Sequence, residues 1–277
     1  MTSVRGEVLV VTGAGGMGEA IARRLGSGRA VVIADFSDAA LERVAAAMRG
    51  DGYDVHPVRV DVSSEREVSM FAATVAELGS LRCLVHTAGV SPVQATSQQI
   101  IDVDVVGTAR ILDAFEALVE PGTVAVCIAS MAGTMTTLAP DVLRLLAVTP
   151  TDELHGLPVL DPALMDPGTA YGVAKRANQM RVQAASTRWG RKGGRVASIS
   201  PGVISTPMGQ AELSGPHGDV MRSMIEMSGT QRVGTPNDIA AAVEFLAGPA
   251  ASFITGIDLL VDGGVIAALG TAPVGGA

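Results

Sequence analysis

Three side chains in the middle of the sequence are of the types that move a proton on and off a substrate oxygen. Ser130 lies in CIASMAG, and Tyr171 and Lys175 lie in AYGVAKRAN. Residues at i and i+4 share one helix face about one turn apart, so the Lys175 ammonium is expected near the Tyr171 phenol. A free phenol has a pKa of about 10, and a value of about 7 requires roughly 4 kcal/mol of preference for the phenolate. We expect Lys175 to supply part of that preference and to lower the pKa of Tyr171.

A Tyr-x-x-x-Lys pair alone is equally typical of an ordinary surface helix, and a glycine-rich stretch near the N-terminus favours the catalytic interpretation. In VVTGAGGMGEAI, Gly13, Gly15 and Gly18 fit G-x-G-x-x-G between an apolar run and a helix expected to begin near Met17. The first glycine permits a tight turn, the second lets the backbone approach a pyrophosphate, and the third lets helix and strand pack closely. Bound phosphates then face the positive end of the helix dipole. The alternative is a purely structural turn.

A carboxylate follows the glycines at the distance that dinucleotide sites require. Asp35 closes the apolar run AVVIAD, about 20 residues beyond the loop, where it can accept both hydroxyls of an adenosine ribose. The same negative charge would repel a 2′-phosphate, so the sequence predicts NAD as the cofactor, with NADP disfavoured. The alternative is that Asp35 only caps the helix that follows.

The elements that must position these residues are visible as apolar, β-rich runs separated by segments of helical spacing. The runs are 7–12, 29–34, 54–60, 82–87, 123–129, 194–199 and 256–261. Continuous rather than alternating apolarity indicates strands that are covered on both faces, and hence a parallel sheet. The chain is therefore predicted to be an α/β protein, a single-domain Rossmann fold with a doubly wound parallel sheet of about seven strands.

The length of 277 residues suits one domain spanning 1–277, within which two stretches interrupt the alternation of strand and helix. They lie at about 133–168 and about 201–235. In doubly wound sheets ligands bind beyond the carboxyl ends of the strands, which is where both stretches begin. We expect both to form walls of an active site.

Composition excludes several classes of partner. A formal charge of −8 with scattered basic residues argues against nucleic acid, and no metal ligand set is predicted. No run reaches the roughly 18 apolar residues of a membrane span, so no membrane association and a cytoplasmic location are expected. Cys83 and Cys127 each lie in an apolar run and are expected to be reduced core residues.

Taken in order along the chain, these residues resemble the short-chain dehydrogenase/reductase family over roughly residues 6–265. The resemblance is carried by the glycine loop and by short segments that follow successive predicted strands. These are Asp61-Val62, His86-Thr87-Ala88-Gly89, Ser130, Tyr171 with Lys175, Pro201-Gly202, Thr206-Pro207-Met208 and Asp262-Gly263-Gly264.

The resemblance implies an NAD-dependent oxidoreductase that moves hydride between nicotinamide and a carbonyl carbon. It implies that Tyr171 is the general acid/base, that Lys175 binds the nicotinamide ribose, and that Ser130 hydrogen-bonds the substrate oxygen, with Asp104 as the fourth catalytic position. It further implies a small-molecule substrate and a homodimer or homotetramer. The residues implied to bind the cofactor are Gly13, Gly15, Gly16, Met17, Gly18, Asp35, Phe36, Asp61, Val62, Thr87, Ala88, Gly89, Tyr171, Lys175, Pro201, Gly202, Val203 and Thr206.

Two local departures from the family pattern concern the glycine loop and a carboxylate. The loop from Thr12 to Gly18 is one residue shorter than is usual in the family, although a pyrophosphate should still fit. In VDVVGTA the family usually has Asn where this chain has Asp104. A carboxylate beside Lys175 would offset part of the positive field and move the activity optimum to higher pH. The alternative is a solvated Asp104 that makes a local helix bond.

A third departure is the length of the 133–168 insertion, which separates Ser130 from Tyr171 by about 40 residues. Its many apolar side chains suggest a cover over an apolar pocket, joined by Met208, Met221, Met224 and Met227 from the later excursion. Members resembling 3α-hydroxysteroid dehydrogenase/carbonyl reductases have similarly long insertions, so a bulky steroid-like or aliphatic alcohol or ketone is the hypothesis. The alternative is that these side chains pack on one another or form a subunit interface.

A different class of function is a dinucleotide-binding regulator that senses the cofactor without turnover. Asp104 and the long insertion favour it, whereas the intact set of Ser130, Tyr171 and Lys175 counts against it.

Overall fold

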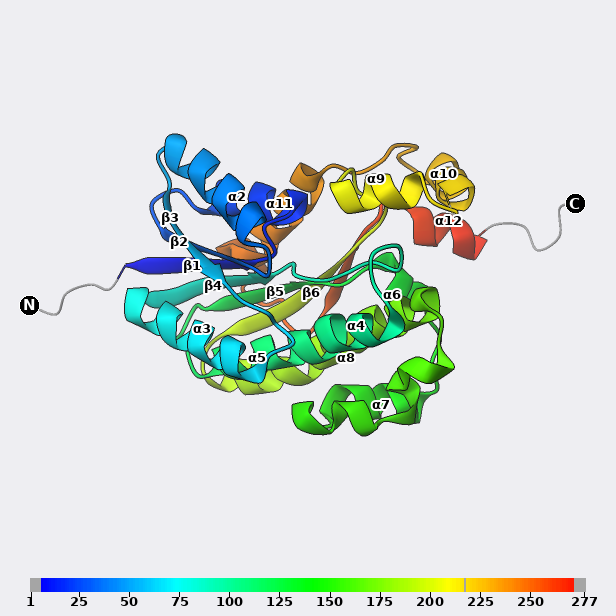
Figure 1. The fold of residues 1–277 in the computed structure, drawn as a ribbon, viewed down its shortest axis with the longest axis horizontal. Coiled ribbons are helices and arrows are strands. Elements are labelled where there is room, and N and C mark those ends of the chain that lie inside the picture. The colour runs from blue at the N-terminus through cyan, green and yellow to red at the C-terminus, as the bar shows by residue number, and fades with distance from the viewer. Residues whose placement is uncertain (1–5, 217, 272–277) are drawn as a thin grey trace, which may run out of the picture.

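The computed structural model describes residues 6–216 and 218–271 and places seven strands in one parallel sheet with the order β3-β2-β1-β4-β5-β6-β7 (Figure 1). The strands are β1 (Glu7–Thr12), β2 (Ala30–Asp35), β3 (Asp54–Arg59), β4 (Ser80–His86), β5 (Val124–Ile128), β6 (Arg195–Pro201) and β7 (Asp258–Val261). Each lies within a few residues of an apolar run in the sequence. The prediction of a single-domain, doubly wound fold of about seven parallel strands is confirmed.

The described helices follow the strands in the alternation expected of crossover connections. The longer ones are α1 (Gly16–Leu25), α2 (Asp38–Gly50), α3 (Glu65–Leu78), α5 (Thr108–Glu116), α7 (Pro140–Val148), α8 (Pro167–Arg191), α10 (Gly218–Met227) and α11 (Pro236–Ala247). The shorter ones are α4 (Ser97–Ile100), η1 (Ile101–Gly107), α6 (Met131–Met135), η2 (Thr151–Gly156), η3 (Pro158–Leu160), η4 (Pro162–Leu164), α9 (Pro207–Leu213), η5 (Pro249–Ala251) and α12 (Val265–Thr271). Of the described helices, none is long and apolar enough to cross a membrane.

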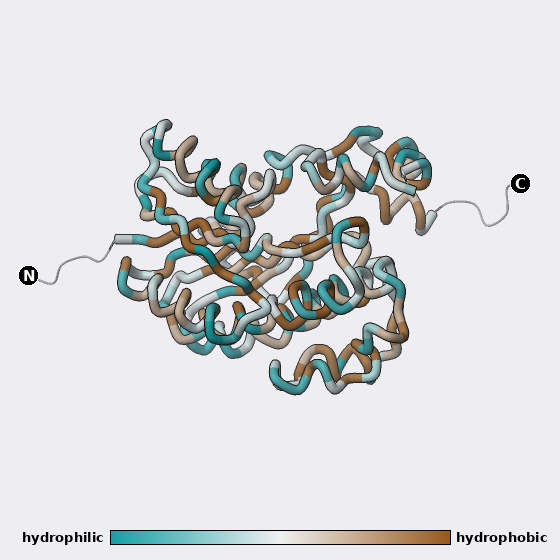
Figure 2. The backbone as a smooth tube through the Cα atoms, in the orientation of Figure 1, coloured by the Kyte–Doolittle hydropathy of each residue, from teal (hydrophilic) through white to brown (hydrophobic). Residues whose placement is uncertain are grey.

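Helices cover the sheet on both faces, which explains why its strands are continuously apolar. One core cluster joins the sheet to α1, α2 and α11, and a second joins it to α3, α5 and α8. In β5 every residue is buried, as a central strand between two helical layers requires. Figure 2 shows hydrophobic stretches along the strands and hydrophilic stretches on the outer turns of the covering helices. Cys83 and Cys127 lie in these clusters as free thiols, and burial raises the pKa of each to about 12.

The strand order creates a crevice at one edge of the sheet. The connection from β1 runs outward to β2 and β3, whereas β4 lies on the other side of β1 and leads to β5, β6 and β7. The connections therefore diverge between β1 and β4, and a doubly wound sheet binds its ligand beyond the carboxyl ends of the strands at this point. The segments that follow the first six strands, β1 to β6, carry the candidate site residues to this edge.

The segment 133–168 does not form the wall that the sequence suggested. Its apolar side chains pack on one another and on η1 and α8, with Leu146, Leu154 and Leu160 fully or almost fully buried in that cluster. In Figure 1, α7 lies outside α8, on the side away from the sheet. The prediction of a cover over the substrate pocket is therefore wrong for most of this segment, and mutual packing, the alternative, is what the structure shows.

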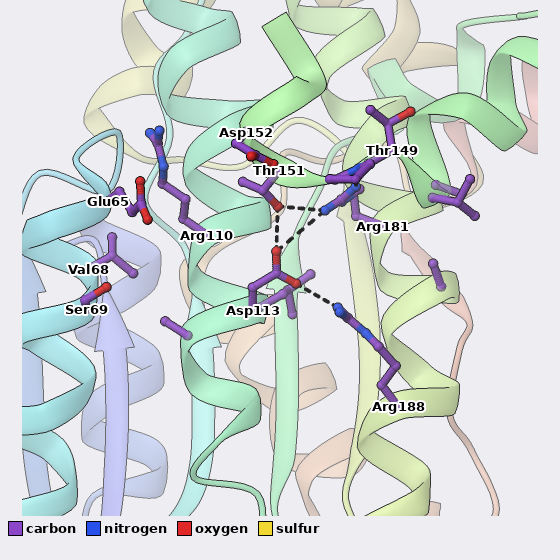
Figure 3. A pocket seen from close by; sticks show the side chains of 16 residues that line it. Glu65, Val68, Ser69, Arg110, Asp113, Thr149, Thr151, Asp152, Arg181 and Arg188 are labelled. Carbon is purple, nitrogen blue, oxygen red and sulfur yellow. Dashed lines mark hydrogen bonds and ion pairs between the residues drawn. The ribbon is translucent and has the colours of Figure 1, made fainter.

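A polar network fastens this segment to the helical layer beneath it (Figure 3). The buried Arg181 of α8 donates to the Thr149 carbonyl and, at 2.9 Å, to Thr151 Oγ1. Thr151 donates to Asp113 of α5, and Arg188 donates to the other oxygen of the same carboxylate at 2.7 Å. These groups line a surface cavity of about 820 Å³ between α3, α5, α8 and the end of α7. The charges of Arg181, Asp113 and Arg188 are already paired within this network. The network therefore anchors the end of α7 and the start of η2 to α5 and α8.

We expect the variant Arg181→Met to loosen this segment without disturbing the sheet. Methionine keeps the apolar stem but removes the hydrogen bonds to Thr149 and Thr151, so the free energy of unfolding should fall by about 1–3 kcal/mol. Hydrogen exchange followed by mass spectrometry should show faster exchange of the amides in 149–156. The matched control is Arg144→Met, because Arg144 is exposed on α7. Equal exchange rates in the two variants would contradict the assignment of Arg181 as the anchor.

Candidate active site

The glycine loop after β1 has a shape that only glycines allow. Gly13 has φ +90°, in the left-handed region, and its amide donates to the Ala34 carbonyl at 2.6 Å. A Cβ atom on Gly18 would lie 1.8 Å from the Gly13 carbonyl oxygen, so the start of α1 can approach the loop only without a side chain there. A Cβ on Gly15 would meet nothing within 4 Å. Gly13 and Gly18 are therefore needed for packing, and the backbone at Gly15 faces open space.

The loop opens into a cleft of about 570 Å³ that collects most of the predicted cofactor residues. Those that line it are Gly13, Gly15, Gly16, Met17, Gly18, Asp35, Phe36, Asp61, Val62, Thr87, Ala88, Gly89 and Thr206. Lining residues that the sequence did not suggest include Gln94, Ala95, Gln99, Asp102 and Val103. They come from residues 94–103, between Thr87-Ala88-Gly89 and Asp104, where no cofactor-binding motif was identified in the sequence.

Asp35 is held in this cleft by backbone amides. Its carboxylate accepts hydrogen bonds from Ala14 N at 2.6 Å and from Ser37 N at 2.8 Å. The helix cap is made instead by Ser37, whose hydroxyl accepts from Ala40 N. Asp35 is therefore not the cap of α2, and its negative charge is fixed beside the glycine loop.

The cleft fits a dinucleotide. Among the described residues no side chain caps α1, so the first amides of this helix have no side-chain acceptor. These amides lie beside the open face of Gly15, where an anionic phosphate would satisfy them. The carboxylate of Asp35 lies farther along the same cleft, where it could accept hydrogen bonds from the hydroxyls of a ribose.

A second, smaller pocket of about 360 Å³ adjoins the cleft and shares Met17, Thr206 and Met208 with it. Ser130 and Tyr171 line this pocket, together with Pro201, Gly202 and Val203 from the end of β6. Most of its other lining residues are apolar or small: Pro92, Val93, Ala129, Met131, Ala132, Met135, Ile204, Gly209, Pro216, Val220, Met221 and Met224. The prediction that the later excursion forms a wall is confirmed. Met227 is half exposed and does not line the pocket, and of the described residues in 133–168 only Met135 does.

Local structure fixes the three polar groups that the sequence singled out. Ser130 lies two residues beyond the end of β5 and caps α6, accepting a hydrogen bond from Ala132 N at 3.2 Å. Tyr171 and Lys175 lie one turn apart near the start of α8, a helix capped by Asp166. Lys175 Nζ lies 5.3 Å from the centre of the Tyr171 ring, as the i, i+4 spacing predicts. Ser130 is close enough to Tyr171 for its side chain to lower the pKa of the phenol.

Asp104 forms a buried ion pair with Lys175. The carboxylate is fully buried on η1, a π-helical turn, and its Oδ2 lies 2.9 Å from Lys175 Nζ. The other oxygen accepts from Val90 N at 2.8 Å. A Cβ on Gly89 would lie 3.1 Å from Lys175 Nζ and 3.2 Å from Asp104 Oδ1, so glycine keeps this approach open. The alternative of a solvated Asp104 is therefore wrong.

His86 is a structural brace beside this pair. Its Nδ1 lies 2.7 Å from Thr12 Oγ1 and its Nε2 lies 3.0 Å from Thr108 Oγ1. Thr108 donates its proton to the Asp104 carbonyl, so it accepts from His86, which we assign as the Nε2–H tautomer. Burial and the charge of Lys175 lower the pKa of His86 to about 3. His86 therefore stays neutral and links β1 to the turn that carries Asp104.

The electrostatics of Tyr171 differ from the sequence-based prediction. Burial raises the pKa of the phenol, the Lys175 ammonium lowers it, and the carboxylates of Asp104 and Glu212 raise it again. The net direction is upward, because Lys175 does not offset the other effects. Burial lowers the pKa of Lys175, but the Asp104 carboxylate and the phenol more than reverse this and keep the ammonium charged. The prediction that Asp104 weakens the positive field is supported, whereas the predicted lowering of the Tyr171 pKa is not found.

Comparison with known proteins gives the family. Residues 7–139 match the family described as short chain dehydrogenase, and residues 163–266 match Enoyl-(Acyl carrier protein) reductase. The short-chain dehydrogenase/reductase bsc3 of Alternaria brassicicola is 41% identical over 265 residues, which cover 94% of this chain and 96% of that protein. The chain therefore belongs to the short-chain dehydrogenase/reductase family, whose members bind NAD(P) and act on CH–OH groups.

Two further similarities involve cyclic secondary alcohols. The cis-4-hydroxycyclohexanecarboxylate dehydrogenase of Sinomonas cyclohexanicum is 31% identical over 264 residues, covering 94% of this chain and 96% of the relative. The crystal structure of the 3-alpha-hydroxysteroid dehydrogenase from Pseudomonas sp. B-0831 complexed with NADH has a TM-score of 0.77 and 26% identity. The match covers 97% of this chain and all of that one.

We predict that Asp104→Asn lowers the pKa of Tyr171, because it removes a buried negative charge that raises it. The protein has two tyrosines, so in a Tyr53→Phe background the ultraviolet absorbance of phenolate reports Tyr171 alone. The titration of the Asp104→Asn protein should begin at lower pH than that of its parent. Asp152→Asn is the control, since Asp152 is an exposed carboxylate of η2. Superimposable titrations of Asp104→Asn and its parent would remove Asp104 from the electrostatics of the site.

Proposed function

We propose that this protein is an NAD-dependent oxidoreductase that interconverts a secondary alcohol and a ketone, with Tyr171 as the general acid/base. The observation that carries this proposal is the placement of Ser130 and Tyr171 in one apolar pocket that opens onto the dinucleotide cleft. The charged Lys175 lies beside the phenol on the buried side of the same helix.

The chain's own residues would hold the substrate oxygen and exchange its proton. In the oxidation direction Tyr171, as phenolate, would accept the proton of the substrate hydroxyl. Ser130 would donate a hydrogen bond to the same oxygen, and Lys175 would stabilise the phenolate. A nicotinamide held in the dinucleotide cleft would supply the two-electron chemistry and, in its oxidised form, a positive charge. The apolar walls exclude water from the reacting atoms.

The raised pKa of Tyr171 favours ketone reduction at neutral pH. Reduction requires the protonated phenol, which a raised pKa preserves, whereas oxidation requires the phenolate. Oxidation of an alcohol should accordingly become fast only in alkaline solution. Burial contributes most to the raised pKa of Tyr171, and Asp104 adds to it, so both would make oxidation more dependent on alkaline pH.

The charges around Asp35 support NAD over NADP. Two arginines lie near the glycine loop and the adenine end of the cleft, and each already contacts carboxylates. Arg43 lies 3.3 Å from Glu19, and Arg59 lies 3.8 Å from both Asp38 and Glu67. A 2′-phosphate would meet the fixed charge of Asp35 without an unpaired guanidinium to balance it. Phe36, over whose ring Arg59 lies at 5.3 Å, offers an exposed aromatic surface for the adenine end.

We also propose that the protein forms a homodimer or homotetramer through the β7 side of the sheet. β7 is an edge strand of the sheet, and on its outer side no further strand of the described chain pairs with it. Three exposed apolar side chains precede β7 in the sequence: Phe245, Phe253 and Ile257. A second copy would remove them from water.

The variant Tyr171→Phe tests the proposed reaction. Loss of the phenolic proton should lower turnover by about 10²–10⁴-fold while NADH affinity, followed by nucleotide fluorescence, stays within about threefold. Tyr53→Phe is the matched control, because the Tyr53 hydroxyl bonds only the Arg23 carbonyl among the described residues. Full turnover by Tyr171→Phe would refute the mechanism. If the wild-type protein binds NADH but reduces no member of a broad ketone panel, a cofactor-sensing regulator is the better description.

A second variant, Asp35→Ser, tests the cofactor preference. Two like charges about 5 Å apart repel by roughly 3 kcal/mol at an effective dielectric constant of about 20, and solvent reduces this. Removing the carboxylate should therefore raise NADPH affinity by one to two orders of magnitude relative to NADH affinity. The measurement is the ratio of the two dissociation constants, with the melting temperature as a check on folding. An unchanged ratio would show that Asp35 does not select the cofactor.

A further inference from the structure

One ionisable side chain of the substrate pocket has no part in the chemistry described so far. Glu212 lies on α9, four residues after Met208, so the two share the helix face that lines the pocket. The other polar side chains of the lining are already engaged. Ser130 and Tyr171 serve the reacting oxygen, and the Thr206 hydroxyl caps α9 by accepting from Gly209 N at 3.1 Å. Glu212 is the remaining hydrogen-bonding group of an otherwise apolar wall.

The surroundings of Glu212 make its carboxylate costly to leave without a partner. Within residues 6–216 and 218–271, no side chain or backbone amide donates a hydrogen bond to this carboxylate, and no arginine or lysine pairs with it. Burial raises the pKa of Glu212, and the charge of Lys175 only partly opposes this effect. Glu212 is half-buried beside methionine, proline and valine side chains, so the desolvation of its carboxylate is only partly offset by water and is not offset by a protein hydrogen bond.

Glu212 is also coupled to the reaction centre. Its negative charge is among the influences that raise the pKa of Tyr171, so the two groups share one low-dielectric pocket. A ligand group that donates a hydrogen bond to Glu212 would weaken the effect of its charge on the pKa of Tyr171. An anionic ligand group would raise this pKa further and would be repelled by the Glu212 carboxylate.

We propose that Glu212 determines substrate specificity by accepting a hydrogen bond from a hydroxyl group that the substrate carries away from its reacting carbon. The inference rests on the proposed function and narrows it, because the substrate becomes an apolar, cyclic or aliphatic ketone that also bears a hydroxyl group. Substrates with a carboxylate at that end are excluded by charge repulsion. In this respect the protein differs from its relative named for cis-4-hydroxycyclohexanecarboxylate, whose substrate is an anion.

The experiment compares ligand binding before it compares turnover. Ketones on monocyclic and bicyclic skeletons are prepared in three forms, in which the carbon remote from the carbonyl carries a methyl, a hydroxyl or a carboxylate group. Dissociation constants are measured by calorimetry with the wild-type protein, Glu212→Gln and Glu212→Leu, each loaded with NAD⁺, which cannot reduce a ketone; turnover is then measured separately with NADH. Glu226→Gln is the matched control, because Glu226 is exposed on the neighbouring α10 and does not line the pocket.

The wild-type protein should bind the hydroxyl form at least about tenfold more tightly than the methyl form, and the carboxylate form most weakly. Glu212→Leu should lose the preference for hydroxyl, whereas Glu212→Gln should keep part of it and bind the carboxylate form better. A general loss of folding would weaken all three ligands equally and so could not imitate this change of order. Glu226→Gln should behave as the wild type.

The two proposals fail separately in this experiment. Binding with the expected order but no NADH oxidation would remove the proposed reaction and leave the role of Glu212 intact. Turnover with equal affinity for the methyl and hydroxyl forms would remove the role of Glu212 and leave the reaction intact. The absence of binding by every form at millimolar concentration would also overturn the assignment of Glu212.

Discussion

The ion pair between Asp104 and Lys175 joins two parts of the chain in a site from which water is excluded. Its atoms lie 2.9 Å apart, with 0% and 7% of the two side chains exposed. Removing one partner of such a pair typically costs about 3–5 kcal/mol, because the other charge stays buried. The pair therefore constrains η1, α8 and the loop at Gly89 together. The position of Lys175 beside Tyr171, and with it the geometry of the candidate site, depends on this constraint.

Much of this arrangement could be predicted from the sequence, because the physical signals are local. Continuous apolar runs predicted seven strands covered on both faces, and β5 is buried throughout. The glycine spacing predicted the turn that Gly13 makes with φ +90°. The i, i+4 spacing placed Lys175 beside Tyr171. Each of these inferences needed only the period of a helix or strand, or the requirement of a glycine. The position of Asp104 beside Lys175 was expected only from the family resemblance.

What could not be predicted depends on contacts between distant parts of the chain. The apolar residues of 133–168 are compatible with a pocket wall and with mutual packing, and only the anchor at Arg181 and Thr151 shows which surface they cover. The net pKa direction of Tyr171 depends on how burial compares with one ammonium and two carboxylates. Glu212 was missed because no motif marks its position on α9, although its i, i+4 relation to Met208 was a usable signal.

The same low dielectric that strengthens Lys175 also strengthens the two carboxylates that oppose it. Lys175 alone would stabilise a phenolate at Tyr171, but Asp104 lies on one side of the ammonium and Glu212 shares the pocket with the phenol. Each partner that satisfies one of these carboxylates changes the proton affinity of Tyr171. A substrate hydroxyl on Glu212 and a cationic nicotinamide would act in the same direction, since both would favour the phenolate. Under the two proposals, specificity and proton transfer would therefore be set by one electrostatic balance.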